Sequence, residues 1–303
     1  MDEKSPYLDE YYQQYYTKKR YRIFDKLRSD NPKLNIILFL STCLTTFMTG
    51  WFQNGYWQAG LWYGGAIISI LLAHEMGHYL MCRKYGIRAT LPFFIPFPIP
   101  FGNPFGTMGA VIKMESRIPS RKALFDVAVA GPLAGLVVTI PCIYYGVQFS
   151  QVIEIGSRTA ENTIFLGESF LYAQISKLAI GTLPENQDVL VHPLAFAGWA
   201  GLFVTALNLL PIGQLDGGHV VYALLGRRHK IVATSALVAF AFICVFIYLG
   251  WALLLLLIIW FGYHHPPTMD ETPIDKKRFA IGILTLIIFL LSFTPEPFKM
   301  QIQ

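Results

Sequence analysis

The chain has 303 residues, of which 54% are hydrophobic and only 14% are charged, and its mean hydropathy is +0.44. A soluble domain carries about a quarter charged residues, so this composition excludes an ordinary soluble domain and indicates an integral membrane protein. The formal net charge is +5, with basic residues gathered between apolar runs, which indicates membrane topology and no nucleic-acid partner.

The N-terminal segment, residues 1–33, begins "MDEKSPYLDEYYQQYYTKKRYR" and contains eight basic residues. It lacks the apolar stretch of a cleaved signal peptide. We expect it to form a cytoplasmic tail whose tyrosines lie at the membrane interface, with substrate recognition as the other interpretation. Residues 34–303 are then expected to form one integral membrane domain.

Apolar runs of about 20 residues, the length that crosses a bilayer as a helix, follow the tail. They cover residues 34–51, 56–81, 123–147, 192–210, 231–263 and 279–293. The run 231–263 is too long for one span, and Gly250 is its natural break, which gives two helices turned back on each other. The prediction is an all-α polytopic membrane protein with about six to seven transmembrane helices and a re-entrant β-containing loop.

Basic residues between the runs indicate how the spans are oriented. The connection 82–122 contains seven basic residues against one acid, and the turn 226–230 contains three basic residues. The connection 148–190 has two basic residues against five acids. Since cytoplasmic connections are rich in Lys and Arg, the N-terminus, the connection 82–122 and the turn 226–230 are expected on the cytoplasmic side.

The motif "HEMGH", residues 74–78, lies towards the cytoplasmic end of the second apolar run. On a helix, His74 and His78 project from one face, one turn apart. This spacing suits two imidazoles that bind one zinc ion, with Glu75 beside them as a general base. Two histidines that hydrogen-bond between helices are the alternative, but titratable groups inside a membrane are costly and usually functional.

The segment that follows, "LPFFIPFPIPFGNPFG" at residues 91–106, has too many prolines to form a regular helix. We expect a re-entrant element over the histidine motif, with an apolar interfacial connection as the alternative. Further on, "GPLAG" at residues 131–135 has two glycines four residues apart. That spacing is typical of close packing between membrane helices.

A catalytic zinc site needs a third protein ligand and an open position for water. The segment "NLLPIGQLDGGH", residues 208–219, offers Asp216 where Pro211 and several glycines break the fourth apolar run. Broken backbone at membrane depth persists only where it is buried in protein or lines a wet cavity. Beside an incomplete His-Glu-His site, this favours a ligand over the alternative, an ordinary turn aspartate before Gly-Gly.

Other titratable residues lie near the ends of the apolar runs. Glu115 and Asp126 lie among basic residues, so we interpret them as surface charge pairs or as groups that stabilise a helix N-terminus. His264 and His265 follow a span, and we interpret them as interfacial. Asp216 is therefore the expected third ligand.

The occurrence of "HEMGH" on one span and "NLLPIGQLDGG" on a later one resembles the site-2 protease family of intramembrane zinc metalloproteases. "GTMGAVIKM" and "FDVAVAGPLAG" are similar to intervening segments of that family, and the similarity covers about residues 57–230. The resemblance implies zinc ligands at His74, His78 and Asp216, a catalytic glutamate at Glu75, and a substrate-holding asparagine at Asn208. The chain has no room for a PDZ or CBS domain, so it resembles the compact branch found in cyanobacteria and plastids.

The implied activity is hydrolysis of peptide bonds within or near the transmembrane segment of a membrane-anchored protein. One zinc ion per chain would acidify a water molecule, Glu75 would move its proton, and the metal with Asn208 would stabilise the oxyanion. The expected partners are that substrate and membrane lipid, in a prokaryotic plasma membrane or a cyanobacterial or thylakoid-type membrane. A membrane transporter or metal carrier is the alternative, and it predicts further titratable groups on several spans.

The segment "GTMGAVIKM", residues 106–114, is a candidate for holding the substrate. A helical substrate must open before cleavage, and its bare N–H and C=O groups then cost several kcal/mol each unless they are paired. We expect an edge strand near the zinc that pairs with the opened substrate, with a purely structural hairpin as the alternative. Its substrate-binding residues would be Gly106, Gly109, Ala110, Val111 and Ile112.

Overall fold

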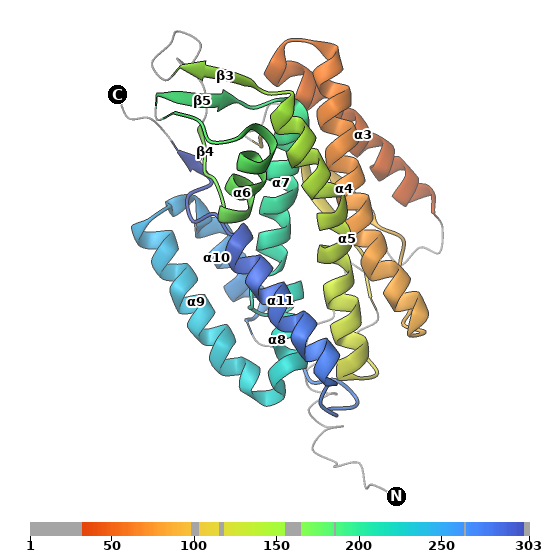
Figure 1. The fold of residues 1–303 in the computed structure, drawn as a ribbon. Coiled ribbons are helices and arrows are strands. Elements are labelled where there is room, and N and C mark those ends of the chain that lie inside the picture. Colours follow the sequence, from red (N-terminus) through yellow and green to blue (C-terminus); the bar gives the residue numbers. More distant parts are fainter. Residues whose placement is uncertain are drawn as a thin grey trace, which may run out of the picture.

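A computed structural model describes residues 32–97, 103–114, 118–154, 165–184, 186–263 and 265–299. Predictions for residues 1–31, for Glu115 and for His264 therefore lie outside the described residues, as does part of the proline run. The described chain is mostly helical (Figure 1).

The helices and strands are as follows. The α-helices are α3 (Lys33–Asn54), α4 (Trp57–Lys84), α5 (Arg121–Gln148), α6 (Phe170–Ile180), α7 (Pro193–Asn208), α8 (Asp216–Leu225), α9 (His229–Phe246), α10 (Ala252–Phe261) and α11 (Lys276–Ser292). The 3-10 turns are η1 (Gly226–Arg228) and η2 (Leu249–Trp251). The strands are β1 (Phe93–Pro96), β2 (Thr107–Val111), β3 (Gln151–Glu154), β4 (Phe165–Leu166), β5 (Gln187–Leu190) and β6 (Phe298–Lys299).

Four helical segments of the described chain are long and apolar enough to cross a membrane. They are α3, α4, α5 and the continuous segment Asp216–Phe246, which joins α8 to α9. Helix α7, predicted as a span, has 16 residues and belongs with the shorter apolar helices. The prediction of an all-helical membrane protein is therefore confirmed in its coarse form, as a mostly helical chain with four candidate spans.

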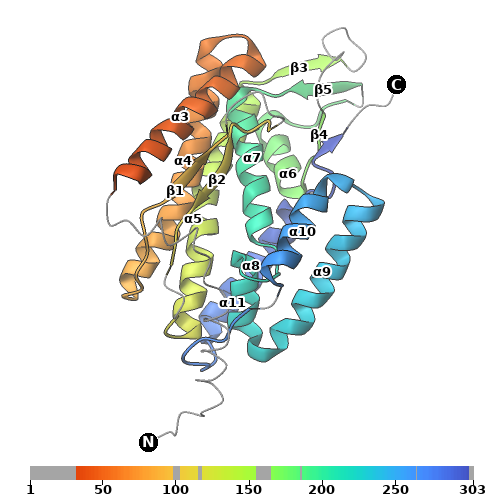
Figure 2. The same cartoon turned by 180° about the vertical axis from the view of Figure 1, so that it is seen from behind.

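The predicted break near Gly250 is confirmed. Helix α9 ends at Phe246, and η2 and α10 follow it after a two-residue interval. Helix α10 turns back beside α9 (Figures 1 and 2). At the end of α9, the carbonyl oxygen of Ile243 accepts hydrogen bonds from the backbone N–H groups of both Ile247 and Tyr248. The α-helical hydrogen bonding stops there, and the chain continues as a 3-10 turn.

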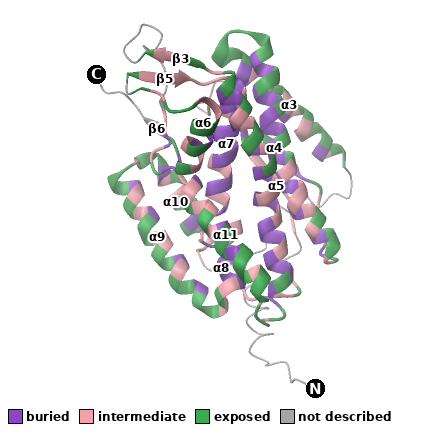
Figure 3. Ribbon diagram, in the orientation of Figure 1, coloured by how far each residue is buried: buried purple, intermediate pink, exposed green. Residues whose placement is uncertain are grey.

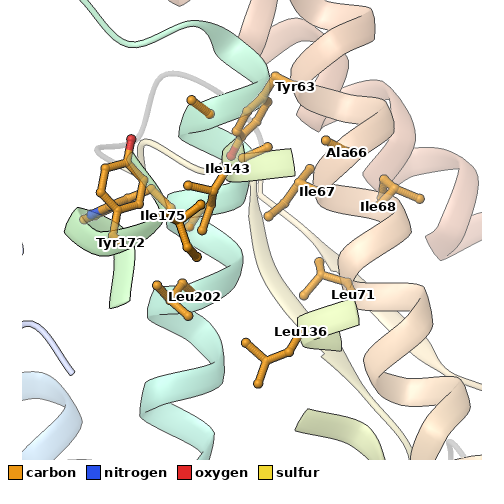
Figure 4. Packing of buried hydrophobic residues seen from close by; sticks show 14 of the residues in the cluster. Tyr63, Ala66, Ile67, Ile68, Leu71, Leu136, Ile143, Tyr172, Ile175 and Leu202 are labelled. Carbon is orange, nitrogen blue, oxygen red and sulfur yellow. The ribbon is translucent and has the colours of Figure 1, made fainter. Parts of the chain in front are cut away.

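The main core lies where α4, α5, α6 and α7 meet (Figure 4). Tyr63 of α4, Ile143 of α5 and Leu202 of α7 are among its fully buried side chains. Because lipid tails are as apolar as leucine, such contacts between membrane helices are stabilised by close packing more than by escape from water. This core holds α4 and α7, which carry the sequence motifs, against α5.

Much of the outer helices is exposed (Figure 3), and many of the exposed residues are large and apolar. Leu40 on α3, Phe246 on α9 and Trp260 on α10 are 60%, 72% and 75% exposed. Apolar faces of this extent are rare on soluble monomers, which supports a lipid environment around α3, α9 and α10.

The proline-rich connection ends in an antiparallel hairpin of β1 and β2, which lies beside α3 and α4 (Figure 2). Phe93 pairs with Val111 and Phe94 with Ala110, and the register shifts before Pro96 pairs with Thr107. The predicted strand is therefore confirmed over Thr107–Val111. Two further two-stranded sheets, β3–β5 and β4–β6, lie at the end of the helical bundle away from α8 (Figure 1).

Candidate metal centre

Helix α4 carries His74 and His78 on one face, as their spacing predicts. Their ring centroids are 4.9 Å apart, and the two Nε2 atoms are 3.1 Å apart. Both residues are buried, at 4% and 6% exposure. The two imidazoles therefore converge on one point inside the protein.

Asp216, the first residue of α8, completes this group. Its Oδ2 atom lies 3.4 Å from Nε2 of His74 and 3.3 Å from Nε2 of His78. Among the residues that the structure describes, these three form the one cluster of His, Cys, Asp or Glu that could hold a metal ion. Segments that are 138 residues apart in the chain thus meet at the predicted site.

Glycines in the break between α7 and α8 make this approach possible. Gly217 and Gly218 follow Asp216 directly, and the start of α8 packs on the backbone of residues 209–213. A Cβ atom at Gly217 would lie 1.9 Å from the Leu209 carbonyl oxygen, and one at Gly218 would lie 2.4 Å from the Gly213 carbonyl oxygen. A side chain at either position would therefore push Asp216 away from α4.

Hydrogen bonding at His78 indicates what the cluster needs. Its Nδ1 atom lies 2.8 Å from the Val127 carbonyl oxygen. A carbonyl oxygen only accepts, so Nδ1 carries the hydrogen, and in the neutral imidazole Nε2 presents a lone pair. That lone pair faces Asp216, whose carboxylate also only accepts. A cation among these atoms can bind all three, and two imidazoles with one carboxylate are ligands that zinc takes in proteins, so this donor set fits a metal ion.

Helix α5 makes room for both rings. A Cβ atom at Gly131 would lie 2.1 Å from Nε2 of His78, and one at Gly135 would lie 3.4 Å from Cβ of His74. On α4, a Cβ atom at Gly77 would lie 2.4 Å from the Ala130 carbonyl oxygen. The prediction of close helix packing at residues 131–135 is confirmed. No pattern in the sequence indicated that the partner of Gly131 is the His78 ring or that Val127 orients it.

Glu75 is buried, at 6% exposure, next to His74 in the chain. The backbone N–H of Ile112, the residue that follows β2, lies near the carboxylate of Glu75. The hairpin therefore ends against the same segment of α4 that carries the two histidines.

Asn208, the last residue of α7, also reaches this cluster. Its Nδ2 atom lies 3.2 Å from Nε2 of His74. The side-chain amide is therefore close to the point on which the imidazoles converge. All five residues singled out in the two motifs meet here: His74, Glu75, His78, Asn208 and Asp216.

The glycines of the predicted substrate strand differ in their surroundings. Gly106 and Gly109 have φ angles of +69° and +93°, in the region that favours glycine. At Gly106 the space for a Cβ atom is taken by Thr49 of α3, at 2.2 Å, whereas at Gly109 nothing lies within 4 Å. The close backbone approach expected at Gly106 is therefore made by α3, and open space remains at Gly109.

Two of the weaker candidates lie elsewhere. The carboxylate of Asp126 forms a two-pronged ion pair with Arg278 of α11, with both N···O distances 2.8 Å, and accepts a hydrogen bond from Tyr85. Its interpretation as a charge pair is confirmed.

The interpretation of His265 as interfacial is wrong, since its side chain is buried, at 6% exposure, against His219. The connection after α10 folds back over α8, which the span pattern did not indicate.

The chain is similar to a known peptidase family and to named metalloproteases. The profile described as Peptidase family M50 matches residues 64–251. Relatives include "Probable zinc metalloprotease EGY2, chloroplastic" of Arabidopsis thaliana, 32% identical over 77% of this chain and 42% of its own length. The protein of that name in Oryza sativa subsp. indica is 30% identical over 87% of this chain and 47% of its own length. "Probable zinc metalloprotease EGY1, chloroplastic" of Arabidopsis thaliana is 31% identical over 76% of this chain and 42% of its own length.

The chain thus spans less than half the length of these curated relatives. No solved structure matches it. The matched residues 64–251 include the histidine motif of α4, the hairpin, and the break before α8.

Proposed function

This chain belongs to peptidase family M50, and from that premise we propose that it is an intramembrane zinc metalloprotease. It hydrolyses peptide bonds within or near the transmembrane segment of membrane-anchored proteins. One observation supports the proposal: ligand atoms of His74, His78 and Asp216 lie within 4.8 Å of one another between apolar helices, and the buried Glu75 follows His74 in the chain.

In this proposal His74, His78 and Asp216 hold one zinc ion. The chemistry supplied by the bound metal is Lewis-acid polarisation of the scissile carbonyl and acidification of a water molecule. Glu75 accepts the proton of that water and delivers it to the leaving amine. The Asn208 amide, which lies beside His74, donates a hydrogen bond to the developing oxyanion.

The neighbouring residues prepare these groups for their roles. The Val127 carbonyl holds the His78 ring in the tautomer whose Nε2 lone pair faces the metal position. The apolar core around α4 keeps bulk water away from Glu75, which favours proton transfer to and from this carboxylate within the site.

Strand β2 is proposed to hold the opened substrate. Its one strand partner among the described residues is β1, so its other edge has backbone groups that a second chain can pair with. Gly109 leaves open space, and Val111 is about half exposed. The proposed contacts are Gly109, Ala110, Val111 and Ile112, with Gly106 fixing the hairpin to α3.

The membrane arrangement is also proposed. Residues 34–303 form the membrane domain, with the catalytic core at about residues 57–230 and six to seven crossings. The β1–β2 hairpin enters the membrane from the cytoplasmic side, where the N-terminus lies. A prokaryotic plasma membrane, or a cyanobacterial or thylakoid-type membrane, is the proposed location, and the chloroplast names of the relatives favour the second.

A transporter or metal carrier is not favoured. It would need further metal-binding groups along a path across the membrane. Within the described ranges, His74, His78 and Asp216 make up the one such group.

The decisive experiment replaces Glu75 by Gln in the full chain, purified in detergent and assayed against a panel of single-pass membrane proteins. Removal of the general base should lower the cleavage rate by about 10²- to 10⁴-fold, with zinc content unchanged. Cleavage at the wild-type rate would refute the catalytic assignment.

The strand proposal needs its own test. Val111→Pro removes one backbone donor from β2 and should depress cleavage strongly, with zinc content unchanged. Cysteines at positions 108–112 should crosslink to residues around the substrate's cut site in the Glu75→Gln background. Repeated absence of crosslinks, with substrate demonstrably bound, would exclude strand addition here.

A further inference from the structure

The connection between α10 and α11, residues 262–275, lies along α8 and the start of α5. At its start, the backbone carbonyl oxygen of Tyr263 accepts a hydrogen bond from the backbone N–H of Gly213 at 3.0 Å, within the break that precedes Asp216. Further on, Met269 and Asp270 donate backbone hydrogen bonds to Ile118 and Pro119, at 3.1 and 3.2 Å. The connection therefore ties the break beside the metal centre to the start of α5.

His265 is the buried side chain of this connection. Its Nε2 atom lies 2.6 Å from Nδ1 of His219 on α8. Its ring stacks on Tyr222, one turn further along α8, with centroids 4.4 Å apart. The backbone N–H of His265 donates to Nε2 of His229 at 3.2 Å. His265 thus joins the connection to α8 and to the start of α9.

The hydrogen bonds around His265 form a complete donor–acceptor chain. Nδ1 of His265 donates to the carbonyl oxygen of Pro266, so Nε2 presents a lone pair. That lone pair accepts the Nδ1–H of His219. Burial and the neighbouring His219 hold the pKa of His265 well below its usual value, which agrees with a neutral ring. No cation is needed here, so we do not interpret this pair as a second metal site.

Helix α8 packs against α5, α9 and α11, and the contact with His265 is made near its N-terminal end, close to Asp216. It has ten residues, begins at Asp216, and is preceded by broken backbone. Gly217 and Gly218 have no side chains with which to fix its rotation. His219 is the first residue after Asp216 whose side chain can do so, one turn along the helix.

We propose that His265 is a positioning residue for Asp216. Through its hydrogen bond to His219, it fixes the rotation of α8 and so holds the Asp216 carboxylate against the two imidazoles of α4. This inference rests on the proposed function, in which Asp216 is a zinc ligand. Groups that orient metal ligands from outside typically change metal affinity by about 10- to 100-fold when they are removed.

Two amides of different length test this role. In His265→Gln the amide oxygen can lie near the position of Nε2 and accept the hydrogen bond from His219. In His265→Asn the amide lies nearer the backbone, so its oxygen cannot reach the Nδ1–H of His219. Thr272→Ala, at an exposed position of the same connection, is the control. For each full-length protein in detergent, we would measure zinc affinity by chelator competition, the visible spectrum of the cobalt(II)-loaded protein, and the melting temperature.

We expect His265→Asn to weaken zinc binding by about 10- to 100-fold and to alter the cobalt spectrum, since both report the position of Asp216. His265→Gln should stay within about threefold of wild type, and Thr272→Ala should match it. Equal zinc affinity and spectra in the Asn and Gln variants, even with lowered melting temperatures, would overturn the positioning role. A wild-type protein that binds no zinc would instead overturn the proposed function, and the inference with it.

Discussion

Among the described residues, two pairs of buried histidines meet nitrogen to nitrogen, and their surroundings differ. In the first pair, His74 and His78, the Nε2 atoms are 3.1 Å apart and both face the carboxylate of Asp216. In the second, Nδ1 of His219 and Nε2 of His265 are 2.6 Å apart. In the first pair both nitrogens face a third potential metal ligand, whereas in the second a hydrogen bond between the rings satisfies both nitrogens.

Nearby imidazoles therefore do not by themselves indicate a metal site. At His78 the Val127 carbonyl takes the ring hydrogen and turns the remaining lone pair towards another acceptor. At His265 the Pro266 carbonyl takes the ring hydrogen, and the remaining lone pair finds the N–H of His219. The first arrangement leaves a carboxylate and two imidazoles free to share a cation, whereas in the second the two rings satisfy each other.

The largest effect should come from removing the carboxylate that faces the first pair. Asp216→Ala should reduce zinc content from one ion per chain to a small fraction, because two imidazoles alone leave the site without its third ligand. The matched change in the second pair, His265→Gln, should leave one ion per chain at saturating zinc. Metal analysis of the purified proteins checks both, and full zinc occupancy in Asp216→Ala would exclude Asp216 as a ligand.

Filling the space beside His78 should have the next largest effect. In Gly131→Ala the new Cβ would lie 2.1 Å from Nε2 of His78, so the ring must shift. We expect zinc affinity to fall by about 10- to 100-fold, as for other changes that misplace a ligand.

Gly65→Ala is the control for this change, since it adds the same methyl group to α4 where nothing lies within 4 Å. It should leave zinc affinity unchanged, because the added methyl group contacts no neighbour and alanine favours the helix more than glycine does. Equal affinities in the two variants, measured by chelator competition, would show that the His78 ring tolerates the added methyl group.

The smallest effect on the metal should come from Asp126, the acidic residue of α5 that pairs with Arg278. Asp126→Asn should leave zinc content and affinity unchanged, because the carboxylate lies in a separate ion pair. Loss of the charged hydrogen bonds should lower the free energy of unfolding by about 1 to 3 kcal/mol. Reversible unfolding in detergent measures this change in the free energy of unfolding. Any loss of zinc in the variant would link Asp126 to the metal centre.

Features that depend on neighbours along the chain could be predicted from the sequence. The spacing of His74 and His78 fixes their common face, because an α-helix repeats every 3.6 residues. Glycine and proline set the break before Asp216 and the limits of the hairpin, since their effects on backbone dihedrals are local. Composition alone indicated a membrane protein.

Only the tertiary structure decided how these local pieces meet. The distance from Asp216 to the two imidazoles depends on how α8 packs against residues 209–213, and no periodicity encodes that contact. The roles of Val127 and Gly131 arise because α5 lies against one particular face of α4. His265 is buried because the connection between α10 and α11 folds back over α8. That connection has no helical or strand periodicity from which its path could be predicted. Helix and turn preferences act over a few residues, whereas donor–acceptor matching and ring packing join residues far apart in the chain.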